Sequence, residues 1–297
     1  MTAREEGFLL LSCHLGDAQR PVLTTAQLRT LAVLARQQVP QEPERDILPE
    51  DLQKLGCSPA LAQQVVGLLS QQSRLRSYID RGRQFDCQPI SRVSPAYPAI
   101  VRQRLGLDSP GCLWAKGDTG LLQTPAIALV GSRDLLEANR EFARCVGREA
   151  ALRGITLVSG NARGADRIAQ NACLDAGGRV ISIVADALWR QPLRRNVLYL
   201  SEGGFDEPFS AQRALSRNRC IHGLGRMVFV AQAELGKGGS WGGTVQNLRS
   251  GWSNVVCFRD GSPASLELER RGAYLASTEE LPEYFAEPFP GQMESLF

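Results

Sequence analysis

Histidine and long apolar runs are scarce in this chain of 297 residues, and each scarcity excludes a class of protein. No apolar run approaches the roughly 18 residues of a membrane-spanning helix, so we expect no membrane partner. The chain has two histidines and eight irregularly spaced cysteines without a C-x-x-C pair, so we expect neither a zinc site nor a disulfide framework, and no cofactor. The N-terminus carries two acids before a short apolar stretch and no clear cleavage site, which predicts a mature cytoplasmic protein.

Basic charge is carried by arginine and is concentrated in the middle of the chain. Of the 34 basic residues, only Lys54, Lys116 and Lys237 are lysines. Residues 1–124 have a net charge of +2, residues 125–275 of +6 and residues 276–297 of −5. Guanidinium groups bind phosphates through two parallel hydrogen bonds, and a basic surface attracts polyanions. The distribution is compatible with a polyanionic partner, although composition alone does not identify one.

The first 120 residues differ in pattern from the rest of the chain. Residues 1–85 have helical periodicity, with helices expected at 24–37, 48–56 and 58–82, and predict a small N-terminal helical domain. Two interpretations of these short helices stay open: they contact a nucleic-acid backbone as helix hairpins do, or they pack on one another. Residues 86–120 are rich in proline and glycine and predict a connector with short strands.

From residue 125 onward, short apolar runs alternate with helical segments. A strand that runs into a glycine turn is expected within 125–133, and another at the start of 155–170. Further strands are expected at 179–188, 197–202, 227–233 and 255–260. This alternation is typical of an α/β fold whose parallel sheet is covered on both faces. We therefore predict a core domain at 121–277. The acidic tail at 278–297 predicts a short helix and a loose end.

Two expected strands run directly into glycine turns that carry arginine. Gly131, Ser132 and Arg133 follow the first strand. The second turn contains four candidate residues, namely Ser159, Gly160, Arg163 and Gly164. Glycine lets a backbone approach a phosphate closely, and the helix after each turn offers free N–H groups to an anion. The pair predicts adjacent phosphate sites, whereas the alternative is that these are ordinary turn glycines of an α/β fold.

Two further segments are candidates for the same site. Arg217, Asn218 and Arg219 lie in an expected helix at 211–225, where residues two apart diverge, so that one arginine faces phosphates while the other packs or pairs. The alternative is a solvated helix face. The stretch 236–251 begins with a glycine-rich loop at 236–243, and its candidates are Gly239, Ser240 and Thr244. Within that loop, Trp241 either stacks on a base or belongs to the core.

Enzymatic motifs are missing from this pattern. The turn after the first strand lacks the G-x-G-x-x-G spacing of dinucleotide-binding enzymes, and the glycines around Lys237 lack the P-loop spacing. No Ser/His/Asp set is placed for acyl transfer. Glu202, Asp166 and Asp175 are the acids expected near strand ends, and Asp166 is expected to cap a helix or pair with an arginine. We therefore predict a binding protein and not an enzyme.

An ordered set of motifs runs along the chain: VGSR (130–133), SGNARGAD (159–166), AGGRVISIVA (176–185), LSE (200–202), SRNRCIHGLG (216–225) and GKGGSWGGT (236–244). This set resembles the DNA-processing protein A family, also called Smf, over residues 8–275. The resemblance implies an extended Rossmann-like parallel-sheet core, a homodimer, binding of single-stranded DNA and loading of the RecA recombinase. It also implies that the candidate residues of the four segments above contact DNA.

The sequence departs from that family in two places. Ala214, Leu215 and Ser216 stand where the family has an aromatic residue before Arg-Asn-Arg, so Trp241 or Phe209 would have to replace it. Few residues follow the core, so no C-terminal winged-helix domain is expected. The final hexapeptide, Gln292–Phe297, resembles peptides that dock into the bacterial sliding clamp, and its alternative is an unused tail. A nucleotide-binding sensor or enzyme of the same superfamily stays open as a second hypothesis.

Overall fold

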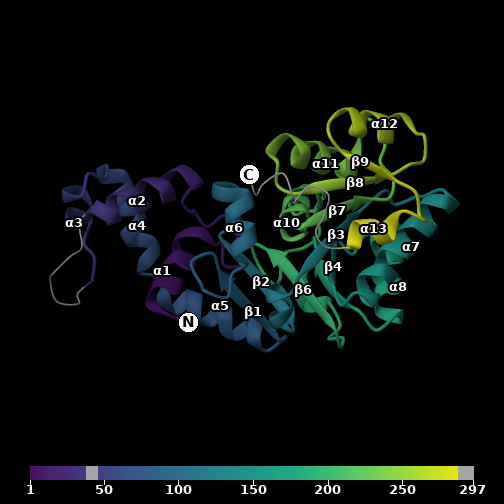
Figure 1. Cartoon of the computed structure of the whole chain (residues 1–297). Coiled ribbons are helices and arrows are strands. Elements are labelled where there is room, and N and C mark those ends of the chain that lie inside the picture. The colour runs from purple at the N-terminus through teal and green to yellow at the C-terminus, as the bar shows by residue number, and fades with distance from the viewer. Residues whose placement is uncertain (38–45, 287–297) are drawn as a thin grey trace.

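A computed structural model of the chain describes residues 1–37 and 46–286, and its centre is one nine-stranded sheet (Figure 1). The strand order is β1-β2-β6-β5-β4-β3-β7-β8-β9. The strands are β1 (Cys87–Ser91), β2 (Cys112–Gly117), β3 (Ala126–Val130), β4 (Thr156–Ser159), β5 (Arg179–Ile183), β6 (Val197–Glu202), β7 (Met227–Val230), β8 (Asn254–Phe258) and β9 (Tyr274–Ala276). In this order, all strands from β6 through β3 to β9 are parallel to one another. Strand β2 runs antiparallel to both of its neighbours, β1 and β6.

Helices cover both faces of the sheet, as the apolar runs predict. One face packs against α7 (Glu137–Leu152), α8 (Ala165–Asp175) and α13 (Leu281–Phe285). The other face packs against α6 (Ala99–Leu105), α10 (Asn218–Leu224), α11 (Gly238–Ser250) and α12 (Pro263–Arg270). Alternate residues of a strand point to opposite faces, so Ile127 and Leu129 enter one core while Ala128 and Val130 enter the other. The predicted α/β, Rossmann-like fold is confirmed.

The N-terminal segment is helical, as predicted, and packs on the sheet in part (Figure 1). Its helices are α1 (Ala3–Ser12), α2 (Thr25–Gln37), α3 (Pro49–Lys54), α4 (Pro59–Leu69) and α5 (Gln72–Arg83). Tyr78 of α5 lies edge-on to Trp114 of β2, with ring centroids 5.2 Å apart. Side chains of α2, α3 and α4 build a separate small core. The helix expected at 58–82 is divided into α4 and α5.

Three further expectations about the elements are corrected. The strand expected at 179–188 ends at Ile183, and the chain continues through a short 3-10 helix, η3 (Leu188–Arg190), before β6. The single helix expected at 211–225 is two, α9 (Ala211–Ser216) and α10. The glycine-rich loop expected at 236–243 is largely the beginning of α11. Among residues 1–37 and 46–286, no helix is long and apolar enough to cross a membrane.

Candidate functional site

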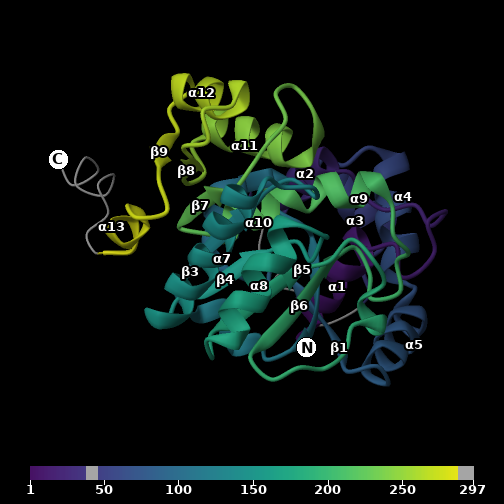
Figure 2. The same cartoon turned by 90° about the vertical axis from the view of Figure 1, so that its right-hand side faces the viewer.

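The order of the strands along the chain changes direction at β3, which is the topological switch point of the sheet. The chain lays down β4, β5 and β6 on one side of β3 and then returns to place β7 on the other side. In open parallel sheets, ligands bind at the carboxyl ends of the strands beside such a reversal. The two predicted glycine turns follow β3 and β4 at this edge. These two strands are neighbours in the sheet (Figure 2). We call residues 131–133 and 159–164 together the glycine rim.

The two turns of the glycine rim touch through their backbones. Gly164 has φ +89°, a conformation that side chains rarely adopt, and a Cβ there would overlap the carbonyl oxygens of Ser132 and Arg133. A Cβ on Gly131 would lie 2.5 Å from that of Ala165. The N–H of Ala165 donates to the Ser132 carbonyl at 3.2 Å. The predicted adjacency of the two turns is therefore confirmed, and glycine at position 164 makes this contact possible.

Asp166 holds the backbone of the second turn through a hydrogen bond. Its buried carboxylate accepts the backbone N–H of Ala162 at 3.1 Å and lies 4.0 Å from the guanidinium of Arg217. Burial raises the pKa of Asp166, while Arg217 and the backbone N–H groups act in the opposite direction. Its oxygens are engaged in holding the turn. The prediction that Asp166 caps or pairs with an arginine is confirmed.

Arg217 points into the protein and not toward solvent. Its side chain is 8% exposed, and its Nη1 donates to the Ile183 carbonyl at 2.7 Å. A Cβ on Gly160 would overlap this guanidinium, so glycine at 160 lets the arginine lie against the end of β4. Burial lowers the pKa of Arg217. The side chain connects the junction of α9 and α10 to the ends of β4 and β5. Its guanidinium is therefore not exposed for binding a ligand at the surface.

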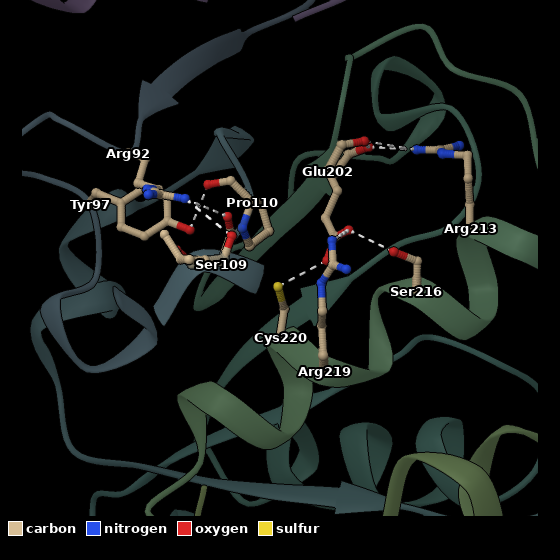
Figure 3. Close-up of polar contacts among 11 residues, drawn as sticks. Arg92, Tyr97, Ser109, Pro110, Glu202, Arg213, Ser216, Arg219 and Cys220 are labelled. Atoms are coloured by element: carbon tan, nitrogen blue, oxygen red, sulfur yellow. Dashed lines mark hydrogen bonds and ion pairs between the residues drawn. The ribbon is translucent and has the colours of Figure 1, made fainter. Parts of the chain in front are cut away.

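Arg219 is also held, by a carboxylate at the end of β6 (Figure 3). Its Nη2 lies 3.1 Å from Oε2 of Glu202, and that oxygen also accepts the Ser216 hydroxyl at 3.1 Å. The Cys220 thiol lies 2.9 Å from Oε1. Burial alone would lower the pKa of Arg219, but Glu202, Cys220 and Asp108 together outweigh it, so the pKa is raised. The alternative prediction, that the arginines of this segment form a solvated helix face, is therefore wrong, because Arg217 is buried and Arg219 is paired.

The candidate residues of α11 lie on a helix and not on a loop. Thr244 is fully buried, and its hydroxyl donates to the Ser240 carbonyl at 2.7 Å. Asn218 donates its amide to the Gly239 carbonyl at 3.0 Å, which joins α10 to the first turn of α11. Trp241 is half-buried and packs on the core, with the Arg271 guanidinium 6.0 Å from its ring centroid. Of the two interpretations of Trp241, the structure supports the core residue.

Of the remaining candidate side chains, the two serines are buried or half-buried and the two arginines are exposed. Ser159 is fully buried, and its hydroxyl accepts the Gln170 amide at 2.6 Å. Ser132 is half-buried and directs both its N–H and its hydroxyl to the Gln232 carbonyl. Arg133 is exposed and makes no ion pair with any described residue. Arg163 is 75% exposed and pairs at 2.9 Å with Asp134, a partner that sequence reasoning missed because it lies across the two turns.

Two helices begin at this edge without a side-chain cap. The residue before α8 is Gly164 and the residue before α11 is Lys237, and neither makes a capping hydrogen bond through its side chain. The first N–H groups of a helix and its partial positive charge attract anions. Together with the exposed guanidinium groups of Arg133 and Arg163, the glycine rim is suited to binding an anion such as a phosphate.

Comparison with known proteins identifies similar chains. The family model described as DNA recombination-mediator protein A matches residues 88–251, more than half of the chain. Protein Smf of Escherichia coli is 33% identical over 164 residues, which cover 51% of this chain and 44% of that protein. The DNA processing protein DprA of Bacillus subtilis is 30% identical over 188 residues, 60% of this chain and 61% of that protein. The chain spans about half the length of the curated relatives it matches.

Two solved structures extend the comparison to the fold. The X-ray structure of DNA processing protein A from Streptococcus pneumoniae superimposes with a TM-score of 0.71 at 25% identity, and covers 95% of this chain and 98% of that one. A DNA processing protein A from Helicobacter pylori superimposes with a TM-score of 0.58 at 25% identity, over 69% of this chain and 98% of that one. The description of the latter concerns its single-stranded DNA binding mode.

Proposed function

The chain belongs to the DNA recombination-mediator protein A family, and on that premise we propose that it binds single-stranded DNA as a recombination mediator. The observation that carries the proposal is the contact between the two glycine turns. This contact places Arg133 and Arg163 at one edge of the sheet, beside the uncapped start of α8. The Helicobacter pylori relative, whose description names single-stranded DNA binding, supports the same ligand.

Phosphates are the part of the strand that this edge recognises. Arg133 makes no ion pair with a described residue and is ready to contact a phosphate. Among the described residues, Arg163 makes an ion pair only with Asp134, which is itself 86% exposed. An ion pair between exposed groups contributes about 0–1 kcal/mol, so a phosphate competes with it easily. Arg217, Asn218 and Thr244 act behind this surface, where they hold the elements that present it.

Catalysis is not part of the proposal. Asp166 is engaged with the backbone of its own turn, and Glu202 is engaged with Arg219, Ser216 and Cys220. Neither carboxylate is placed as a free acid or base at the glycine rim. We propose that the protein acts by holding the strand. Homodimer formation, loading of the RecA recombinase and a cytoplasmic location are retained as proposals, and the sliding-clamp peptide at 292–297 lies outside the described residues.

Substitution of the exposed arginines tests the proposal by the salt dependence of binding. We expect Arg133→Ala and Arg163→Ala to bind single-stranded oligonucleotides more weakly, with the slope of log affinity against log salt reduced by about 0.7 for each lost contact. Asp134→Asn frees Arg163 and removes a negative charge, so we expect it to bind about threefold more tightly at low salt. Fluorescence anisotropy at several salt concentrations measures both effects.

Arg249→Ala is the matched control, because Arg249 is an exposed arginine in the last turn of α11, the end remote from the helix N-terminus. We expect this variant to bind like the parent. Unchanged affinity in both Arg133→Ala and Arg163→Ala would refute the proposed phosphate contacts. Saturable binding of a mononucleotide by a parent protein that binds no oligonucleotide would instead favour the nucleotide-ligand hypothesis.

A further inference from the structure

The connection between β5 and β6 carries an exposed aromatic surface next to the glycine rim. Trp189 lies in η3 and is 37% exposed, and Phe85, at the end of the α5 segment, is 39% exposed. Their ring centroids lie 5.3 Å apart. The guanidinium carbon of Arg190 lies 5.2 Å from the centroid of the Trp189 ring. We call Phe85, Trp189 and Arg190 the crossover platform.

The surroundings of the crossover platform are basic. Arg190, Arg194 and Arg195 lie on the connection itself and Arg167 lies on α8; all four are exposed, and none makes an ion pair with a described residue. Arg194 and Arg167 both act on the phenol of Tyr199, so the connection and α8 bring positive charge to the same part of the sheet. Of the acids near the rings, Asp206 is engaged by Tyr78 and Arg81, whereas Asp86, the residue after Phe85, is exposed.

A hydrogen bond joins the platform to the glycine rim. Asn161 of the second turn donates its amide to the Gln191 side chain at 3.3 Å, and Gln191 lies two residues after Trp189. The platform is also anchored from behind. The Trp189 N–H donates to the Phe205 carbonyl at 3.1 Å, and Lys116 of β2 donates to the Trp189 carbonyl at 3.0 Å. A ligand that extends past Asn161 therefore meets a fixed aromatic surface.

We propose that a single DNA strand leaving the glycine rim continues across the crossover platform, where Trp189 stacks on a base and Arg190 contacts a phosphate. This inference rests on the proposed function. A protein partner is the less favoured occupant, because Arg190 lies against the Trp189 ring without an ion pair to a described residue, and such a charge matches a polyanion. Aromatic rings between basic side chains are the usual arrangement of sites that bind single strands without sequence preference.

The dependence of affinity on oligonucleotide length tests the inference. A thymidine oligonucleotide of about 6 nucleotides is short enough to occupy the glycine rim alone, and one of about 20 nucleotides also reaches the platform. We expect Trp189→Ala to bind the longer oligonucleotide about tenfold more weakly, the effect of losing one stacked base, and to bind the shorter one like the parent. Trp189→Phe keeps an aromatic face and should bind both like the parent.

Tyr274→Ala is the matched control, because Tyr274 is a 40% exposed aromatic residue on β9, at the opposite edge of the sheet. It should bind both oligonucleotides like the parent. If the parent binds no DNA, the proposed function fails and this inference fails with it. If Arg133→Ala weakens binding while Trp189→Ala binds the longer oligonucleotide normally, the inference alone is wrong. A change of oligomeric mass without a change of DNA affinity would assign the platform to a protein contact.

Tryptophan fluorescence gives a second test, which does not depend on the folding of Trp189→Ala. Trp114 and Trp252 are buried and Trp241 is half-buried, whereas Trp189 is on the surface. We expect the longer oligonucleotide to quench the fluorescence of the parent, and Trp189→Phe to lose this quenching while it still binds. Equal quenching in the parent and in Trp189→Phe would overturn the inference.

Arg190→Ala should weaken binding of the longer oligonucleotide only. An equal loss of affinity for both lengths would count against a separate platform.

Discussion

Gly160 and Arg217 share one small space at the carboxyl edge of the sheet: a Cβ on the glycine would overlap the guanidinium of the arginine. The arginine is buried, donates to the Ile183 carbonyl at 2.7 Å and faces Asp166 at 4.0 Å. A buried cation is tolerated only when it is hydrogen-bonded and paired. The glycine in the predicted phosphate turn therefore serves an internal contact, which fixes the turn that presents Arg163.

Adding one methyl group at position 160 tests this relationship. We expect Gly160→Ala to lower the free energy of unfolding by about 2 kcal/mol, because the guanidinium would be forced out of its hydrogen bond. Urea denaturation measures the change. Gly242→Ala is the matched control, because a Cβ there, in the middle of α11, meets no atom within 4 Å. Alanine is favoured over glycine in a helix by about 0.8–1 kcal/mol, so the control should be neutral or stabilising. Equal stability of Gly160→Ala and the parent would refute the overlap.

The carboxylate of Glu202 is expected to hold α9 and α10 on the sheet. Glu202→Ala removes the acceptor of Arg219, Ser216 and Cys220 at once, and leaves a half-buried guanidinium without its partner. We expect a loss of about 3 kcal/mol in the free energy of unfolding, measured by denaturant titration. The control Glu137→Gln acts on a carboxylate that is 83% exposed and 3.9 Å from Arg140, and should change stability by less than about 0.5 kcal/mol. A loss no larger than that of the control would show that Glu202 has no anchoring role.

Stability should fall in acid because of His222. The ring is fully buried, its Nδ1 lies 3.1 Å from the Asn247 amide, and burial lowers the pKa of His222 to about 3. The unfolded chain protonates this histidine at about 6.5, so the unfolded state binds more protons between pH 6.5 and 3. The contribution of the neutral ring is therefore complete above pH 6.5 and is lost as the pH falls toward 3.

Comparison with a variant isolates this contribution from that of the carboxylates. We expect the free energy of unfolding of the parent to fall by about 3 kcal/mol more than that of His222→Gln between pH 7 and pH 4.5. Denaturant titrations of both proteins at the two pH values measure the difference. Parallel losses in the two proteins would show that His222 does not contribute to the acid sensitivity.

The strands were predictable because their signal is local. A buried parallel strand needs four to six consecutive apolar residues, and VLYLSE coincides with β6 from Val197 to Glu202. The first turns of α11 were not predictable, because their glycines resemble a loop. Here tertiary packing overrides low helix propensity: a Cβ on Gly239 would lie 2.7 Å from the Asn218 amide, so glycine allows α11 to approach α10 closely. The three-residue strand β9 is too short to give a pattern.

The chain's sequence alone determined the alternation of strands and helices, the two glycine turns at strand ends and the likeness to a known family, since each of these depends on neighbours in the chain. Only the tertiary structure decided which of these arginines are exposed and which are buried or paired. Arg133 and Arg163 are exposed, whereas Arg217 is buried against Gly160 and Arg219 is paired with Glu202. The direction of a long side chain is set by the partners that folding brings beside it, and those partners lie tens of residues away along the chain.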